Sequence, residues 1–526
     1  MTAHPAGGQA ATAARPVRRP DPVEDGYLLA LDAGTGSCRA VIFDLAGRQV
    51  ALAQREWSHP ADPGIAGSQN FDTAGNWTLI CACIREILQS VADPGAVLAI
   101  GCSSMGGGLV LYDRAGREVW ACANGDARAQ RQARALLDSG MAGQLYQLGG
   151  GWISLSAPPR LDWVRQHQPA LWQSCARLSM ITDWMVYRLT GTLATESSIG
   201  STSGLFDLNA RTWSAPIMDL CGLRPSLFPE VVGAGTAVGT VTPEASRQTG
   251  LATTTQVVPG GVDTALALAG AQLHPQWPAR DRLAITGGSF WKHTAVTTAA
   301  AIEPAGRLRT ICHILPGQWL VEGIGFYAGF ALRWLRDNFA RPPHGRTPGG
   351  YAALEQLASN VPPGSRGLFA DVAPVDAWTL ASWRPPFPAA RPGPPSPASL
   401  GARVRAIEEA AAYLARRSSE ILAELLGMQL REVILTGGAA RGKLWPQILA
   451  DVLGLAIRMP NVTESTAAGA AAVAGLAVGV RPDAAATADL ASPPTRIAKP
   501  VPAQRQAYQE IYGQWQRRRP GRAAER

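Results

Sequence analysis

The chain has 526 residues, enough for roughly two to four domains, which excludes a small module held together by disulfides. Lys and Arg total 48 against 40 Asp and Glu, and part of the excess lies in the two tails, so the folded body is close to neutral. Only 17% of the residues are charged, and no basic stripe is interleaved with aromatic side chains. This composition gives no electrostatic basis for binding nucleic acid.

Cysteine spacing and the N-terminal segment favour a cytoplasmic location. The eight cysteines are scattered without a Cys-x-x-Cys pair or a matching His spacing, which favours reduced thiols over a zinc site. No window reaches 18 consecutive apolar residues, so no membrane partner is expected. Residues 1–26 lack the apolar segment of a secretory signal, and we expect a disordered tail there, with a transit peptide as the alternative.

The first half of the chain alternates predicted strands and helices. Residues 27–44 contain two apolar runs around a Gly/Thr/Ser turn, which predicts a β-hairpin, and a third strand is expected near Val50. Further strands are expected at 97–102, 109–112 and 119–123, and helices at 76–89, 126–137 and 159–166. Alternation of this kind is typical of an α/β domain.

A second region with a similar beginning starts at Arg282. An apolar strand again runs into a Gly-rich turn, and a long helix at 403–426 and a strand at 432–435 follow. Two such regions predict a duplicated α/β architecture with a cleft between the halves. We expect domains at 27–272 and 281–500, a helix and basic tail at 501–526, and a proline-rich surface loop at 383–399.

The turn of the predicted hairpin is the first candidate site, with the sequence Asp32-Ala-Gly-Thr-Gly-Ser37. Its small residues allow backbone N–H groups to approach a polyphosphate closely. Asp32, at the end of a buried strand, is suited to hold Mg²⁺ rather than to touch phosphate. An ordinary Asp/Gly turn is the alternative. A dinucleotide fingerprint is excluded, because a strand and not a helix follows the glycines.

The second candidate site is Asp263, which follows Gly260 and Gly261 directly before an Ala-rich helical stretch at 264–271. A carboxylate at such a helix start can accept the proton of a hydroxyl whose oxygen attacks phosphorus. Its alternative role is that of a helix N-cap.

Two further strand-to-glycine turns occur at 286–289 and 436–443. In the second, the glycines precede a helix expected to begin near Leu444, which suits a nucleotide. It is not a Walker loop, because Leu444 stands where a hydroxyl is needed. Asp126 and Arg128 are expected in the first turn of a helix, where they could grip a polyol or merely cap the helix.

These motifs together resemble the FGGY carbohydrate kinases over roughly residues 27–515. The resemblance rests on the Asp32-x-Gly-Thr-Gly-Ser start, the Gly260-Gly-x-Asp263 element, the Gly287-Gly-Ser-Phe-Trp291 turn and the segment from Gly437 to Asp451. Within the family, residues 30–37, 119–128, 181–184 and 442–452 are most similar to the kinases of the quorum-sensing signal autoinducer-2.

The resemblance implies an actin-like α/β fold of two ribonuclease-H-type domains that close on ATP, Mg²⁺ and a small sugar-like substrate. By that likeness Asp263 is the general base and Asp32 holds Mg²⁺ through water. The residues implied for the phosphates are Gly34, Thr35, Gly36, Ser37, Gly287, Gly288 and Ser289, and those for adenine are Gly437, Gly438 and Ala439. The substrate side would contain Met105, Gly106, Asp126 and Arg128 besides Asp263.

One departure from the family pattern bears on the substrate. Where autoinducer-2 and glycerol kinases carry an Arg-Glu pair, this chain has Met105-Gly106-Gly107-Gly108, which is reminiscent of the Met-His-Gly of pentulose kinases. The expected activity is phosphorylation of a hydroxyl of autoinducer-2 in its open dihydroxypentanedione form. The alternatives are a pentulose kinase, acting on xylulose or ribulose, and a non-catalytic sugar and ATP sensor. A monomer or homodimer is expected.

Overall fold

The computed structural model describes residues 26–270, 281–325, 327–340, 350–372, 375–380, 385–387, 397–460, 464–480 and 495–518. The predicted domain boundary at 272–281 and most of the predicted loop at 383–399 fall outside these ranges, as do nearly all of the predicted N-terminal tail and the last residues of the basic tail. Within the described residues, no helix is both long and apolar enough to cross a bilayer.

The N-terminal domain is built on a six-stranded sheet with the order β12-β13-β4-β1-β2-β3. The predicted hairpin is confirmed, because β1, β2 and β3 form an antiparallel meander, whereas β4 and β13 run parallel to β1. The strands are β1 (Tyr27–Ala33), β2 (Ser37–Asp44), β3 (Gln49–Glu56), β4 (Val97–Ser104), β12 (Gly239–Thr240) and β13 (Gln256–Val262).

Helices cover both faces of this sheet, which explains why β1 is apolar at nearly every position. Side chains alternate along a strand, so Leu28 and Ala30 pack on one face and Leu29 and Leu31 on the other. The first face meets α10 (Asp263–Gly270) and α15 (Ser465–Ala477), and the second meets α1 (Thr73–Leu88) and α6 (Ile181–Thr190). β1 therefore lies in the middle of a three-layer α/β arrangement.

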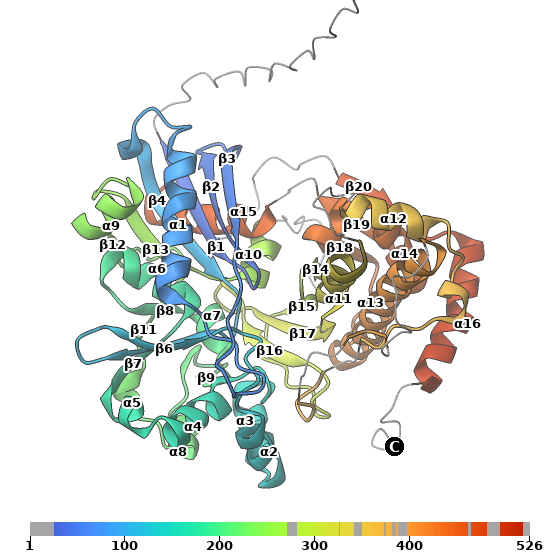
Figure 1. Cartoon of the computed structure of the whole chain (residues 1–526), viewed down its shortest axis with the longest axis horizontal. Helices are drawn as coiled ribbons and strands as arrows, with labels where there is room; N and C mark the ends of the chain where they lie inside the picture. The colour runs from blue at the N-terminus through green and yellow to red at the C-terminus, as the bar shows by residue number, and fades with distance from the viewer. Residues whose placement is uncertain are drawn as a thin grey trace, which may run out of the picture.

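A smaller layer extends below this sheet in Figure 1, around a three-stranded sheet with the order β6-β5-β7. The predicted helix at 126–137 begins later, at Gln130, because the Asp126 carboxylate bonds to Arg128 and to the backbone N–H of Gln69 instead of capping a helix. The elements here are β5 (Leu109–Asp113), β6 (Glu118–Cys122), β7 (Cys175–Met180), α2 (Gln130–Asp138), α3 (Met141–Gly149), α4 (Ala157–His167) and α5 (Pro169–Ser174).

Short elements connect this layer to β13. They are β8 (Ala194–Glu196), α7 (Ser197–Ser201), β9 (Phe206–Asp207), β10 (Thr212–Trp213), α8 (Ala215–Cys221), β11 (Glu230–Val232) and α9 (Pro243–Thr249). β8 and β11 pair in parallel, and β9 pairs with β10.

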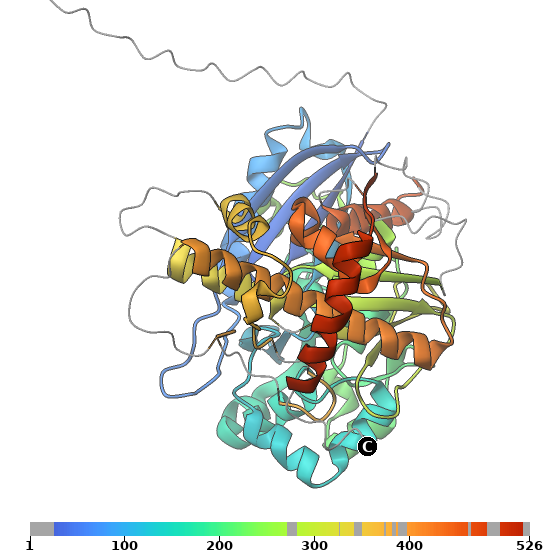
Figure 2. The same cartoon turned by 90° about the vertical axis from the view of Figure 1, so that its right-hand side faces the viewer.

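The C-terminal domain contains a seven-stranded sheet with the order β16-β17-β15-β14-β18-β19-β20. Its strands are β14 (Arg282–Gly287), β15 (Trp291–Thr297), β16 (Arg309–Cys312), β17 (Trp319–Gly325), β18 (Glu432–Thr436), β19 (Ala456–Pro460) and β20 (Thr495–Ala498). Its helices are α11 (Ala328–Leu335), α12 (Tyr351–Ser359), α13 (Pro397–Leu426), α14 (Leu444–Leu453) and α16 (Pro502–Arg518). In Figure 2, α16 crosses the long α13, and Tyr508 and Tyr413 make an edge-to-face contact there.

The two sheets repeat one topology, which confirms the predicted duplication. In the first, β3-β2-β1 are antiparallel and β1-β4-β13 are parallel; in the second, β17-β15-β14 are antiparallel and β14-β18-β19 are parallel. The turn after β1 and the turn after β14 are therefore equivalent, and they face each other across the molecule (Figure 1).

The helix α15 connects the two domains. In the chain it lies between β19 and β20 of the C-terminal sheet, yet it packs against β1, β4 and α10 of the N-terminal domain, among the blue strands of Figure 1. A Cβ at Gly469 would lie 2.1 Å from the Leu266 carbonyl oxygen, so only glycine permits the observed approach of α15 to α10. The N-termini of both helices face the space between the domains, where Thr466 and Asp263 meet.

Candidate active site

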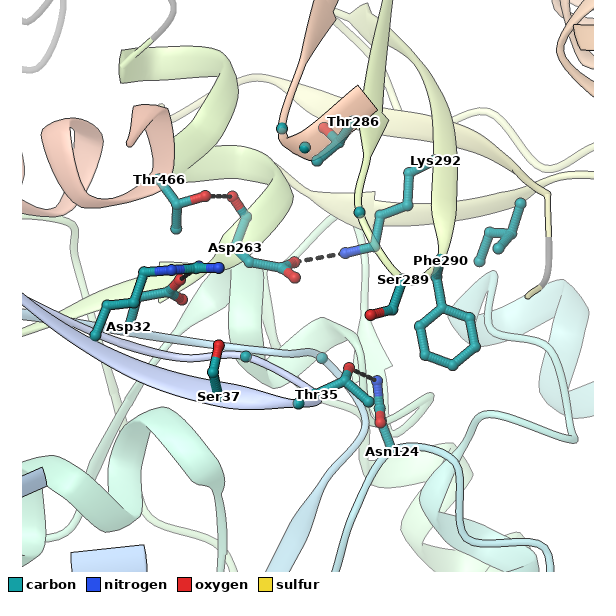
Figure 3. Close-up of a pocket in the computed structure, with 18 of the residues that line it drawn as sticks. Asp32, Thr35, Ser37, Asn124, Asp263, Thr286, Ser289, Phe290, Lys292 and Thr466 are labelled. Atoms are coloured by element: carbon teal, nitrogen blue, oxygen red, sulfur yellow. Dashed lines mark hydrogen bonds and ion pairs between the residues drawn. The ribbon is translucent and has the colours of Figure 1, made fainter. Parts of the chain in front are cut away.

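A cleft between the two domains collects most of the predicted site residues (Figure 3). The predicted residues that line it are Asp32, Gly34, Thr35, Gly36, Ser37, Gly106, Asp263, Gly288, Ser289, Gly437 and Gly438. Tertiary structure adds lining residues that were not among the predicted site residues, namely Arg39, Asn124, Leu155, Thr286, Phe290, Lys292, Arg309, Ile324, Arg333 and Thr466.

Asp32 is the last residue but one of β1, and its carboxylate is almost completely buried. Its Oδ2 accepts a hydrogen bond from Arg39 Nη1 at 3.0 Å, whereas its Oδ1 is buried without a partner among the described residues. Burial raises the pKa of Asp32 from 3.8 to about 6, against the lowering effect of Arg39, and repulsion from Asp263 and Glu464 adds to the rise. An orphaned carboxylate oxygen in this position fits Mg²⁺, which binds one or two carboxylates together with water and phosphate oxygens.

Asp263 is the first residue of α10 and points into the cleft with its side chain 28% exposed. Oδ1 accepts hydrogen bonds from Thr264 N at 2.7 Å, Thr264 Oγ1 at 3.1 Å and Lys292 Nζ at 2.5 Å. Among the described residues every hydrogen bond to this carboxylate falls on Oδ1, which leaves Oδ2 available. An N-cap side chain accepts from the second or third N–H of its helix, and Asp263 shows no such bond.

The turns after β1 and after β14 present backbone N–H groups and hydroxyls to the cleft. Arg333 reaches across from α11 to Gly36, where an added Cβ would lie 2.5 Å from its guanidinium. Arg333, Lys292 and Arg39 thus place three cations around these turns. Such a set suits a polyphosphate, since charge-assisted hydrogen bonds to phosphate are the strong ones.

Gly287 and Ala439 do not line the cleft, because the turn after β14 packs on the turn after β18. A Cβ at Gly287 would lie 2.6 Å from the Cβ of Ala439, and Gly437, with φ of 81°, approaches the Gly287 carbonyl. These residues bring the ends of the parallel strands β14 and β18 together. Gly288 and Gly438, their neighbours, are the residues that face the cleft.

The predicted substrate segment 105–108 contributes backbone rather than side chains. Met105 is 1% exposed and does not line the cleft. A Cβ at Gly106 would lie 2.8 Å from Thr202 Cγ2, and Gly107 has φ of 83°. The buried Arg160 donates to the carbonyl oxygens of Gly107, Asn124 and Asp126, so it fixes this segment to the neighbouring loop. The positive φ of Gly107 therefore favours glycine there, and a side chain at position 106 would have to displace Thr202.

Asp126 and Arg128 lie outside this cleft, in a buried network of their own. The Arg128 side chain is fully buried, forms ion pairs with Asp62 at 2.9 Å and Asp126 at 2.7 Å, and lies between the rings of Trp120 and Trp163. Asp126 Oδ2 also accepts from Gln69 N. In this structure the pair holds loops together behind the cleft, and its contact with substrate stays a prediction.

The fold and the cleft define a two-domain α/β protein in which glycine turns from both domains line one cleft. Residues 27–270 match the model of the FGGY family of carbohydrate kinases, N-terminal domain, and residues 283–478 match that of the C-terminal domain. The chain belongs to the FGGY family of carbohydrate kinases. It is therefore a phosphotransferase that uses ATP and acts on a small sugar-like substrate.

Curated relatives of high similarity carry one name. The chain is 39% identical over 501 residues to the autoinducer-2 kinase of Salmonella typhimurium, 38% to that of Klebsiella pneumoniae and 37% to that of Escherichia coli, with 93% of each chain covered. This similarity confirms the resemblance found in the sequence. Among solved structures, gluconate kinase and ligand-bound xylulose kinase from Lactobacillus acidophilus match with TM-scores of 0.79 and 0.78, each at 19% identity over 95% of this chain and 99% of the other. These structures support the two-domain fold.

Proposed function

We propose that this kinase transfers the γ-phosphoryl group of ATP to a hydroxyl of autoinducer-2 in its open dihydroxypentanedione form. The Asp263 carboxylate carries the proposal for the transfer step: donors occupy Oδ1, and Oδ2 is left to accept the proton of an acceptor hydroxyl. The curated relatives named autoinducer-2 kinase support the choice of acceptor.

The walls of the cleft are compatible with a small ketone. Leu155, Phe290 and Ile324 line it and pack in one hydrophobic cluster that spans the two domains. Asn124 donates to Thr35 Oγ1 at 3.1 Å, and its Oδ1 is buried without a partner among the described residues. The apolar wall suits a short ketone with a methyl end better than a polyol hydroxylated at every carbon, and Asn124 Oδ1 can accept from one hydroxyl of either.

In the proposed transfer the acceptor hydroxyl lies against Asp263 Oδ2 and in line with the γ-phosphorus. Its oxygen forms a bond to phosphorus, the bond to the β–γ bridging oxygen breaks, ADP leaves, and the proton moves to Asp263. The turns at 34–37 and 288–289 hold the phosphates from opposite sides. Catalysis is then mainly positioning together with electrostatic stabilisation.

Asp32 Oδ1 is the oxygen that would hold Mg²⁺, directly or through water. When bound, the ion neutralises charge on the β- and γ-phosphates. A metal would also favour the ionised form of Asp32, whose pKa burial raises to about 6. Below this pH, without metal, the carboxyl is mostly protonated.

An ATP-consumption assay tests the proposal, with dihydroxypentanedione, xylulose, ribulose, glycerol and no acceptor compared in parallel. We expect dihydroxypentanedione to be turned over with the highest kcat/KM. Asp263→Asn should lower kcat by about 10²- to 10⁴-fold, because a general base contributes that much, while nucleotide affinity changes little. Unchanged turnover in this variant would remove Asp263 from the reaction.

The same assay decides between the proposed acceptor and a pentulose. The glycine-rich segment at 105–108 brings no charged clamp into the cleft, which is the observation that favours a pentulose kinase as second candidate. Selective turnover of xylulose or ribulose would replace the proposed acceptor. Binding of ATP without turnover of any acceptor would instead indicate a non-catalytic sugar and ATP sensor.

A further inference from the structure

Lys292 lines the cleft, and its two neighbours in the chain are buried in the core. It is the second residue of β15 and pairs in register with Thr286 of β14. Its neighbours Trp291 and His293 are fully buried on the other face of the strand, and Trp291 packs on Trp445 at 4.6 Å between ring centroids. Because side chains alternate along a strand, Lys292 is directed into the cleft, where its side chain is 12% exposed.

The Lys292 ammonium group bridges the two domains. Nζ donates to Asp263 Oδ1 at 2.5 Å and to Thr264 Oγ1, both at the start of α10, whereas Lys292 itself belongs to the C-terminal sheet (Figure 3). An ammonium group has three N–H donors. Two are used here, and the third has no acceptor among the described residues.

Lys292 lies next to the residues proposed to bind the transferring phosphoryl group and the acceptor hydroxyl. Gly288 and Ser289 lie on the same hairpin and line the same cleft, and Asp263 marks the site of the acceptor hydroxyl. A cation that touches the base and also lies beside the phosphate turn stands between the two reacting partners. In phosphoryl transfer, Lys and Arg at this position stabilise the charge that spreads over the phosphoryl oxygens.

We propose that Lys292 is a catalytic residue that contacts the γ-phosphoryl group through its third N–H while it holds Asp263 Oδ1. It keeps its proton throughout, whereas the acceptor proton goes to Asp263 Oδ2 as the new oxygen–phosphorus bond forms. This inference rests on the role of Asp263 proposed above. Because Lys292 and Asp263 come from different domains, domain closure would align base, acceptor and phosphoryl group in one movement.

Lys292→Met tests the proposal, with Lys499→Met as a matched control, because Lys499 is exposed and outside the cleft. We expect kcat in the ATP-consumption assay to fall by about 10²- to 10³-fold in Lys292→Met, as when one transition-state donor is lost, and to be unchanged in the control. Lys292→Arg should recover part of the loss, since the charge is kept. If Lys292 merely blocks Asp263, kcat would rise instead, and the proposal would fall.

Calorimetric binding of nucleotides separates contact with phosphate from an effect exerted through Asp263. We expect Lys292→Met to lower the affinity for the β,γ-imido analogue of ATP by about tenfold or more. The affinity for ADP should be unchanged, since only the analogue carries a γ-phosphate. The same selective loss should occur in the Asp263→Asn background. Equal effects on both nucleotides, or no loss in that background, would overturn the contact.

The two proposals fail differently. Normal turnover by Asp263→Asn would overturn the base and with it the proposed transfer. Loss of turnover in Asp263→Asn combined with unaltered affinity for the ATP analogue in Lys292→Met would overturn the role of Lys292 alone.

Discussion

Asp32 is a carboxyl whose burial outweighs the ion pair that it makes. Burial raises its pKa from 3.8 to about 6 although Arg39 lies 3.0 Å away. Because the folded state then binds the proton more tightly than the unfolded state, this group favours folding below about pH 4, and the contribution is lost as the pH rises through 6. A shift of this size corresponds to about 3 kcal/mol. The ionised Asp32 carboxylate of the proposed metal site therefore lowers the stability of the folded protein.

We predict that Asp32→Asn raises the thermal midpoint at pH 8 and that the difference disappears near pH 4. The asparagine carries no charge to bury, so it lacks the cost that wild type carries at high pH. Thermal denaturation of both proteins at the two pH values measures this. Asp113→Asn is a control for which the opposite effect on the thermal midpoint is expected. Hydrogen bonds from Arg117 lower the pKa of Asp113, so its replacement should lower the midpoint at pH 8. Equal midpoints of wild type and Asp32→Asn at pH 8 would contradict the prediction.

At the scale of elements, the crossing of α10 and α15 positions the start of both helices. A Cβ at Gly469 would lie 2.1 Å from a backbone oxygen of α10, and a Cβ at Gly270 would lie 2.0 Å from one of α15. The close approach of the two helices therefore depends on glycine at both positions. Asp263 and Thr466 stand at the N-termini of these helices, and Thr466 Oγ1 donates to the Asp263 carbonyl at 3.4 Å. Any separation of the helices therefore moves the proposed base.

We predict that Gly469→Ala destabilises the protein by about 1–3 kcal/mol and lowers kcat, because the added methyl group has to push α15 away from α10. Gly143→Ala in α3 is the matched control. Its Cβ would meet only Trp378, at 3.9 Å, and alanine favours a helix, so stability should be equal or higher. Chemical denaturation and the kinase assay measure the two effects. Wild-type stability in Gly469→Ala would show that the helices separate without cost.

At the scale of the whole molecule, the two domains are not independent in sequence order. The helix α15 lies between β19 and β20 of the C-terminal sheet in the chain but covers part of one face of the N-terminal sheet, where Ala467, Ala470 and Ala474 are buried against β1 and β4. A fragment that ends at residue 270 keeps α10 on this face but leaves uncovered the part that α15 packs against.

We predict that a fragment of residues 26–270 binds a hydrophobic dye and lacks the cooperative thermal transition of the full chain. Exposed apolar faces of this kind bind such dyes and lose specific packing. Adding a fragment of residues 281–518 should reduce dye binding, because it supplies α15. A cooperative transition of the first fragment at the temperature of the full chain would show that α15 is dispensable.

The sequence by itself determined the duplication, the glycine turns and part of the secondary structure. The predicted strands correspond to β1–β6, β14 and β18, and the predicted helices to α1, α2, α4, α10, α13, α14 and α16. These features depend on residues that are contiguous or periodic: Asp32 with its turn, and Asp263 after two glycines, are encoded within a few positions. Strand alternation and turn chemistry act locally, so they can be read without knowing the packing. The predicted start of α2 was early by four residues, because the carboxylate of Asp126 has partners distant in the chain.

Only the tertiary structure decided which side chains face the cleft. Lys292 reaches Asp263 from the second sheet, Arg333 reaches Gly36 across the domains, and no periodicity in the sequence marks either pair. Arg128 matched a predicted substrate residue, but its partner Asp62 is 66 positions away, and the pair is buried in a network behind the cleft. Long-range electrostatic pairs arise when distant segments pack, so their partners are determined by the fold and not by local spacing.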